Sequence, residues 1–270
     1  MNTANTKSTK RSSRPPVVMI HGAFCGGWAF EGWAQLFRAQ GYAVTAPTLR
    51  HHDGGGRDAL AGVSLIDYAD DLQSELAALG GAPILIGHSM GGLLAQMLAA
   101  RVRVRALVLL APSPPYGVLP STAFEVASAQ ALYLAGDFWN KALKPAHWVA
   151  ESHSLDLLPD AERASVLSRF VPESGLATFE IMHWPLDPRR ASQVDARAVT
   201  APILSLVGEK DRINPPATVR RVAARYKTRA VHQELPGHSH WLIGEPGWQK
   251  IAQRALRWLD EVLAEEVETA

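Results

Sequence analysis

Short apolar runs and longer segments of helical periodicity alternate along the chain from Pro16 onwards. The short runs are rich in Val, Ile and Leu and end at or near Gly, His or Pro, which is typical of buried strands. Six such runs lie at residues 17–21, 42–46, 83–87, 106–110, 203–207 and 230–235. Apolar residues at intervals of three and four predict helices at residues 33–40, 65–79, 92–101, 217–226 and 248–266. This alternation predicts an α/β fold in which helices cover a mainly parallel six-stranded sheet.

The alternation is interrupted once, by about 90 residues between the predicted strands near Ala111 and Pro202. The interrupting segment has helical spacing and contains Phe124, Phe138, Trp139, Trp148, Phe170, Phe179 and Trp184. We expect residues 113–198 to form a helical cap, in which most of these rings pack together and a minority line a pocket. Residues 15–112 and 199–270 then form the core, and the polar, basic residues 1–14 form a disordered tail.

Charge and composition restrict the partners of the protein. Lys and Arg number 27 against 26 Asp and Glu, so no excess charge favours a nucleic acid or an anionic membrane. The single cysteine, Cys25, excludes a disulfide framework and a metal site built on paired cysteines. No apolar run reaches the roughly 20 residues of a membrane span, and no secretory signal is recognisable. We expect a cytoplasmic monomer or homodimer that binds a small molecule and neither nucleic acid nor membrane.

The segment PILIGHSMGG at residues 83–92 predicts a nucleophile. An apolar strand runs into G-x-S-x-G, with Ser89 at its centre, and a helical pattern follows directly. On such a strand-to-helix turn the positions two before and two after the serine have to be small. The helix that begins after Ser89 directs backbone N–H groups at the place where an oxyanion would develop.

In its motifs and their order, the chain resembles the α/β-hydrolase superfamily from Pro16 to the C-terminal helix. The segment HGAFCGGW at residues 21–28 is similar to the H-G-A-x-x-G-x-W segment of plant methylesterases and their hydroxynitrile lyase relatives. In that family the residue after His-Gly donates a backbone N–H to the oxyanion hole. The resemblance therefore implies Ala23 as one donor, and the amide of Met90 is the second. Three residues beside these motifs are expected to be structural: His21, His88 and Cys25.

A serine nucleophile needs a histidine base, and the base needs a carboxylate that fixes its tautomer. In this fold the chain order is serine, acid, histidine. The segment GEKDRINP at residues 208–215 resembles the family's G-x-x-D-x-x-x-P, which makes Asp211 the predicted acid and Glu209 the alternative.

The loop LPGHSHWLIGEP at residues 235–246 resembles the histidine loop of the family and offers two histidines. His240 is the predicted base because apolar residues follow it and Glu245 stands five positions later. His238 is the alternative, because it follows Pro-Gly directly.

These motifs predict a serine hydrolase that cleaves a small carboxylic ester through an acyl-enzyme, with a catalytic triad and without metal or organic cofactor. Thioesterase, lactonase, amidase and C–C bond hydrolase activities stay open, because they use the same triad. A lyase is disfavoured, since the lyase relatives carry threonine where this chain has Gly22, and Lys210 does not match their lysine. A non-catalytic ligand-binding homologue is the alternative from another class.

Overall fold

The computed structural model describes residues 14–54 and 56–269. The predicted tail, residues 1–14, lies outside the described residues except for Arg14. That residue donates hydrogen bonds of 2.6 Å to the Tyr42 hydroxyl and to Asp260.

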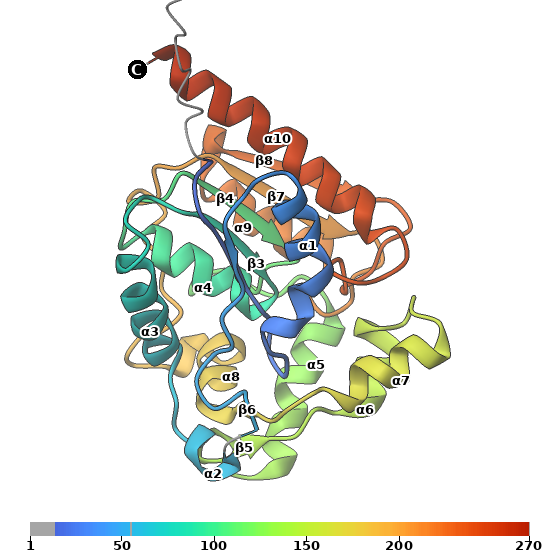
Figure 1. Ribbon diagram of the computed structural model, residues 1–270. Coiled ribbons are helices and arrows are strands. Elements are labelled where there is room, and N and C mark those ends of the chain that lie inside the picture. The colour runs from blue at the N-terminus through green and yellow to red at the C-terminus, as the bar shows by residue number, and fades with distance from the viewer. Residues whose placement is uncertain (1–13, 55, 270) are drawn as a thin grey trace, which may run out of the picture.

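A parallel sheet of six strands in the order β2-β1-β3-β4-β7-β8 forms the centre of the molecule (Figure 1). The strands are β1 (Val17–Ile20), β2 (Val44–Thr45), β3 (Ile84–His88), β4 (Ala106–Leu110), β7 (Ile203–Gly208) and β8 (Ala230–Leu235). Each strand lies within or overlaps one of the six predicted runs, so the predicted α/β fold is confirmed. The residues of β1, β3 and β4 are all buried, because a parallel sheet is covered on both faces.

Helices cover both faces of this sheet (Figure 1). They are α1 (Glu31–Ala39) and α10 (Trp248–Thr269) on one face, and α3 (Leu65–Ala77), α4 (Met90–Ala99) and α9 (Pro216–Ala224) on the other. Successive side chains of β1 alternate between the two cores. Val17 and Met19 pack with α1 and α10, while Val18 and Ile20 pack with α3 and α4. Each helix that was predicted to cover the sheet thus has a counterpart in the structure.

The segment between β4 and β7 consists of short helices joined by loops and contains a two-stranded antiparallel sheet. Its elements are α5 (Ala123–Ala131), η2 (Leu132–Ala135), η3 (Phe138–Asn140), β5 (Ala142–Leu143), α6 (His147–Val149), the π-helical turn η4 (Ala150–Ser154), α7 (Asp160–Ser168), β6 (Glu173–Ser174), α8 (Gly175–Met182) and η5 (Trp184–Leu186). The remaining short helices are η1 (Gly27–Phe30), α2 (Arg57–Leu60) and η6 (Lys227–Arg229).

Two hydrogen bonds place this inserted segment at the carboxyl ends of the strands. The amide of Val171 donates to the carbonyl oxygen of Phe24, in the loop after β1, at 2.9 Å. The Ser239 hydroxyl, in the loop after β8, donates to Asp156 at 2.6 Å. Ligands of open α/β sheets bind at this edge. Within the described ranges, no helix has both the length and the apolar content that a membrane span requires.

Candidate active site

Ser89 lies on the sharp turn between β3 and α4, with φ 54° and ψ −121°. A positive φ is uncommon for a residue with a side chain, and such strain is characteristic of functional sites. Backbone hydrogen bonds hold the turn on both sides. The Ser89 amide donates to the carbonyl of Leu110 at 3.0 Å, and the Ser89 carbonyl accepts from the amides of Gly92 and Ser113, each at 2.9 Å. The backbone that carries this half-buried serine is therefore fixed on both sides.

The two glycines of the motif are required by close backbone contacts. A Cβ atom on Gly87 would lie 2.2 Å from the carbonyl oxygen of Gly91. A Cβ atom on Gly91 would lie 2.1 Å from the carbonyl oxygen of Ile20, in the neighbouring strand β1. Both obstacles are backbone atoms that cannot rotate away. Gly87 is thus needed for the turn to close, and Gly91 for the turn to pack against β1.

His240 and Asp211 form a buried pair from two loops, one after β8 and one after β7. His240 Nδ1 donates to Asp211 Oδ2 at 2.8 Å. The other carboxylate oxygen, Oδ1, accepts from the backbone amides of Ile213 and Asn214, each at 2.9 Å. Because Asp211 accepts on both oxygens, it holds the histidine with its proton on Nδ1, and Nε2 is left as an acceptor.

The two alternative residues of these loops have other partners. His238 Nδ1 pairs with Oε1 of the buried Glu245 at 2.8 Å, and Glu245 also accepts from the amide of Ser239. The exposed Glu209 accepts from the amide of Gly237 at 3.0 Å. Thus the predicted acid and base contact each other, whereas His238 and Glu209 each bond elsewhere.

His88 connects the nucleophile turn to the histidine loop. Its Nε2 donates to the carbonyl oxygen of His240 at 2.9 Å, and the two rings are 4.9 Å apart. Burial, together with the neighbouring His240, lowers the pKa of His88 to about 3, so this ring is neutral. The residue before the nucleophile therefore holds the backbone of the predicted base.

The predicted oxyanion donors, Ala23 and Met90, lie after β1 and at the first position of α4. Within the described part of the chain, neither backbone amide donates a hydrogen bond to another residue. Phe24 follows with φ 65°, in a turn that ends the extended course of β1. Two unpaired amides beside a strained serine are the arrangement that an oxyanion requires.

His21 fixes the peptide group that carries the Ala23 amide. Its Nε2 accepts from the amide of Leu49 at 3.0 Å, so Nδ1 carries the proton and donates to the carbonyl oxygen of Gly22 at 2.8 Å. That carbonyl and the Ala23 N–H belong to one planar peptide. Burial, with a smaller contribution from nearby His52, lowers the pKa of His21 to about 4. His21 is thus neutral and fully buried, in agreement with a structural role.

Cys25 is also buried in this loop, and its thiol is protonated. Burial, and to a lesser degree the charge of Glu173, raises the pKa of Cys25. A protonated, buried thiol is a poor nucleophile.

Three buried acids have hydrogen-bond partners that the sequence motifs do not predict. They are Glu173, Glu180 and Glu245. The first two lie in the apolar contexts FVPESG and TFEIM of the inserted segment, and a charged residue in such a context is the signal that could have identified them.

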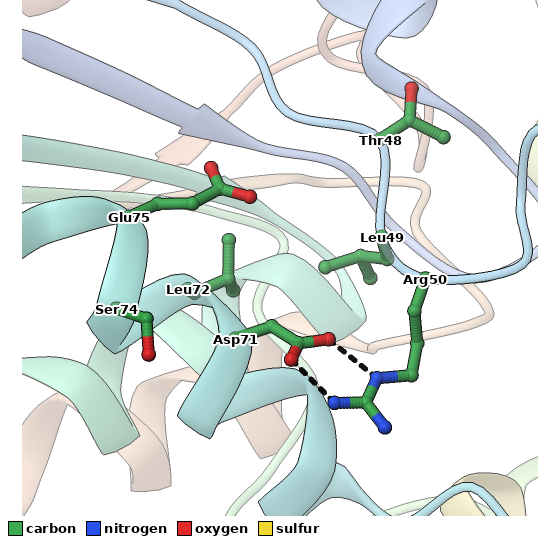
Figure 2. Close-up of a pocket in the computed structure, with 7 residues that line it drawn as sticks. All are labelled: Thr48, Leu49, Arg50, Asp71, Leu72, Ser74 and Glu75. Carbon is green, nitrogen blue, oxygen red and sulfur yellow. Dashed lines mark hydrogen bonds and ion pairs between the residues drawn. The ribbon is translucent and has the colours of Figure 1, made fainter.

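Two surface grooves lie away from the predicted triad. One, of about 340 Å³, runs between the loop after β2 and α3, where Arg50 forms a bidentate ion pair with Asp71 (Figure 2). The other, of about 680 Å³, lies on the inserted segment and includes Asp156, the partner of Ser239. The predicted catalytic residues line neither groove.

The sequence matches the alpha/beta hydrolase family over residues 17–253, which is most of the chain. The chain belongs to this family. The expected resemblance to the superfamily is therefore confirmed, and a strained serine before α4 is consistent with it.

Three curated relatives carry functional names. The chain is 36% identical over 83 residues to a pyrethroid hydrolase of Sphingobium wenxiniae, covering 31% of this chain and 30% of that protein. It is 31% identical over 99 residues to a carbendazim hydrolyzing esterase of a Nocardioides species, covering 34% of this chain and 40% of that protein. A monoacylglycerol lipase of Mycolicibacterium smegmatis is 28% identical, and the match covers 91% of this chain and 88% of that protein. The chain thus matches less than half the length of the first two relatives.

Solved structures share the fold at lower identity. A monoacylglycerol lipase from Paleococcus ferrophilus superposes with a TM-score of 0.68 at 24% identity, covering 93% of this chain and 95% of that one. A methylesterase from Arabidopsis superposes with a TM-score of 0.66 at 17% identity, covering 91% and 99%.

Proposed function

We propose that this protein is a serine esterase that hydrolyses small carboxylic esters through an acyl-enzyme on Ser89. The main support is the buried His240–Asp211 pair, which leaves Nε2 of the histidine free to accept a proton. Ser89, on its strained strand-to-helix turn, is the nucleophile that would supply this proton. The names of the relatives, a hydrolase, an esterase and a lipase, support the same reaction class.

In the first half-reaction, Ser89 Oγ attacks the carbonyl carbon of the ester while His240 Nε2 takes the hydroxyl proton. Asp211 stabilises the resulting imidazolium. The amides of Ala23 and Met90 bind the oxyanion, and loss of one such donor typically costs roughly 100- to 1,000-fold in kcat. The alcohol then leaves with the proton held by His240. Water repeats the sequence on the acyl-enzyme, which releases the acid and restores Ser89.

We further propose that residues 113–198 act as a cap that supplies most of the substrate pocket. Phe170 from this segment packs against Trp28 after β1 and against Trp241, which follows His240, with ring centroids 6.4 and 6.1 Å apart. The aromatic wall beside the predicted base favours substrates with a moderately apolar acyl or alkyl group.

Replacement of Ser89 by alanine tests the proposal. We expect hydrolysis of p-nitrophenyl acetate to fall by about three orders of magnitude or more, because the substitution deletes only the attacking oxygen. Labelling by a fluorophosphonate should be lost in parallel, while the thermal unfolding curve should be nearly unchanged. A variant that retains more than about a tenth of the wild-type rate would remove Ser89 from this role.

A series of p-nitrophenyl esters with increasing acyl length, together with a matched thioester, lactone and amide, then defines the substrate class. Absence of turnover and of a burst with every one of these substrates would instead favour a ligand-binding protein.

A further inference from the structure

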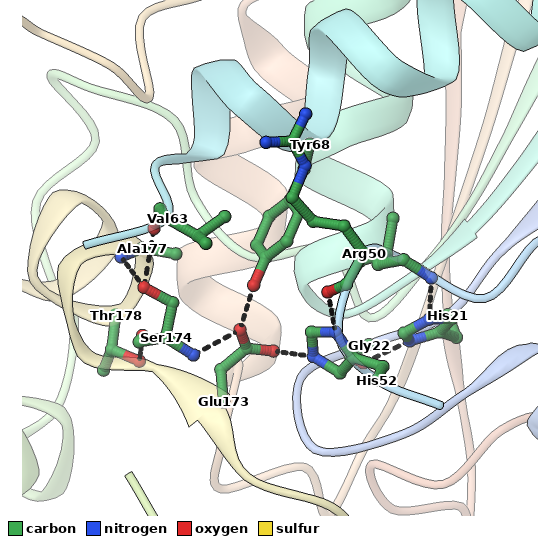
Figure 3. Close-up of polar contacts among 11 residues, drawn as sticks. His21, Gly22, Arg50, His52, Val63, Tyr68, Glu173, Ser174, Ala177 and Thr178 are labelled. Atoms are coloured by element: carbon green, nitrogen blue, oxygen red, sulfur yellow. Dashed lines mark hydrogen bonds and ion pairs between the residues drawn. The ribbon is translucent and has the colours of Figure 1, made fainter. Parts of the chain in front are cut away.

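A fully buried carboxylate, Glu173 of β6, joins the inserted segment to the core (Figure 3). Its Oε1 accepts from the Tyr68 hydroxyl of α3 at 2.8 Å and from the Ser174 amide at 2.7 Å. Its Oε2 accepts from His52 Nε2 at 2.9 Å. Both oxygens are thus bonded to donors, and no part of the carboxylate side chain is exposed to solvent.

Both ring nitrogens of His52 lie opposite hydrogen-bond acceptors, which favours the doubly protonated ring. Nε2 faces Glu173, and Nδ1 faces the carbonyl oxygen of Arg50 at 3.0 Å, so each nitrogen meets an acceptor. Burial disfavours the charged form, but the hydrogen bond and charge of Glu173 outweigh it and raise the pKa of His52. Burial likewise opposes the Glu173 anion, but the same bond and charge from His52 outweigh it and lower the pKa of Glu173.

The charged ring of His52 lies directly against His21, which holds the predicted oxyanion peptide. The two ring centroids are 5.3 Å apart, at an interplanar angle of 60°. His21 needs an unprotonated Nε2 to accept from Leu49 and a protonated Nδ1 to orient the Gly22 carbonyl. A neighbouring cation disfavours a second proton on His21, so His52 helps to keep this ring neutral, while the Leu49 amide selects the tautomer that orients the peptide.

We propose that Glu173 and His52 are positioning residues for the esterase reaction: as a buried ion pair they hold the His21 ring and, through it, the peptide that presents the Ala23 amide to the oxyanion. This inference rests on the proposed function. The two histidine–carboxylate pairs then have opposite tasks. In the first, His52 stays protonated beside Glu173, whereas in the second, His240 has to be neutral to accept the serine proton.

The surroundings of His52 leave few other charges to consider. Glu173 faces it from β6, Tyr68 faces it from α3 with ring centroids 5.7 Å apart, and His21 faces it from the loop after β1. Within its own loop His52 bonds to the Arg50 carbonyl, while the Arg50 guanidinium is paired with Asp71. Glu173 is therefore the group whose ionisation sets the charge of His52.

Glu180 provides a matched control. It is a second fully buried carboxylate of the inserted segment, and it accepts from the Ser64 hydroxyl and the Leu65 amide at the start of α3, each at 2.7 Å. It ties the same segment to the core but has no hydrogen bond or ion pair with His52 or His21 among the described residues.

The experiment compares Glu173→Ala, Glu173→Gln and Glu180→Ala with p-nitrophenyl acetate, at a temperature where each variant is folded. We expect Glu173→Ala to lower kcat by about 10- to 100-fold with KM nearly unchanged, because a displaced oxyanion donor affects the transition state alone. Glu180→Ala should lower the melting temperature but keep kcat within about threefold. Glu173→Gln can retain all three hydrogen bonds, with its amide donating to a neutral His52, but it removes the charge of the pair, so its kcat should lie between those of Glu173→Ala and the wild type.

Two further readouts separate this inference from the proposed function. Nitrogen NMR of histidine-labelled protein should show His52 with two protonated ring nitrogens in the wild type at pH 8, and with one in Glu173→Gln. A neutral His52 in the wild type, or equal kcat losses in Glu173→Ala and Glu180→Ala, would overturn the inference while Ser89-dependent turnover persists. Turnover that is insensitive to Ser89→Ala would instead overturn the proposed function.

Discussion

Replacing Asp211 by asparagine should slow the enzyme through the tautomer of His240, and the structure dictates how the new side chain will lie. One carboxylate oxygen of Asp211 accepts two backbone amides, from Ile213 and Asn214. Asparagine can satisfy both amides only with its carbonyl oxygen at that position. Its NH₂ group then faces His240 Nδ1 and donates to it. The ring proton is thereby moved to Nε2, where it blocks acceptance of the Ser89 proton.

The size of the effect follows from the cost of the opposite orientation. Turning the asparagine so that its oxygen meets His240 leaves two backbone amides facing an NH₂ group. An unpaired buried donor costs about 1–3 kcal/mol, so the flip costs about 2–6 kcal/mol in total. At about 1.4 kcal/mol per factor of ten, kcat should fall by between about 30-fold and about 20,000-fold.

Stopped-flow measurement of the acylation burst with p-nitrophenyl acetate isolates this step from deacylation. Glu209→Gln is the matched control, because Glu209 is exposed and its side chain accepts from the amide of Gly237 and not from a histidine of the described loop; it should change the burst rate by less than about threefold. Retention of more than a third of the wild-type burst rate by Asp211→Asn, or a larger loss in Glu209→Gln, would refute the reasoning.

Three further predictions address the loop histidines, the glycine turn and the buried pair. His240→Ala should abolish the acylation burst, whereas His238→Ala should keep a substantial fraction of it; loss in His238→Ala alone would reverse the assignment. Gly91→Ala should lower the free energy of unfolding by about 3 kcal/mol or more in chemical denaturation, since the added carbon overlaps fixed backbone. The stabilisation from Glu173 and His52 should be lost as pH falls through the lowered pKa of Glu173 and as it rises through the raised pKa of His52; denaturation of the wild type and of the doubly substituted Glu173→Gln, His52→Gln protein across pH should converge at both extremes.

The core of the fold could be predicted from sequence because its elements carry local signals. A buried strand can be recognised by its short apolar run, and a covering helix by its apolar face, without knowledge of what either packs against. All six strands lie where such runs were predicted. The glycines around Ser89 were predictable because they belong to a short motif, G-x-S-x-G, between a strand and a helix. The roles of Ser89, Asp211, His240, Ala23 and Met90 stay predictions.

The choice between the two loop histidines illustrates a limit of spacing arguments. His238 and His240 are two residues apart, and each has a carboxylate partner in the structure. The partner of His238, Glu245, lies in the same loop, whereas Asp211 comes from the loop after β7. Only the packing of β8 beside β7 brings that second loop to His240.

The inserted segment was predictable as helical but not in its attachment to the core. Its short strands, β5 and β6, have two residues each, too few for an alternating pattern to be recognised. Glu173 is buried because of His52 and Tyr68, which lie 121 and 105 positions earlier in the chain. No local pattern encodes a pair of that separation, so the apolar context of Glu173 can indicate burial but cannot identify the residues that it bonds.

The position of Glu173 also sets a rule for engineering this enzyme by exchange of the inserted segment. A segment transplanted from another hydrolase would remove the acid and leave His52 in the core without its counter-charge. Breaking a buried ion pair from one side is strongly destabilising, whereas replacing both partners by well-packed apolar residues is often neutral. A chimaera should therefore either supply a carboxylate at the position of Glu173 or replace His52 at the same time. Exchange of the segment between the ends of β4 and β7 alone would leave His52 without its partner.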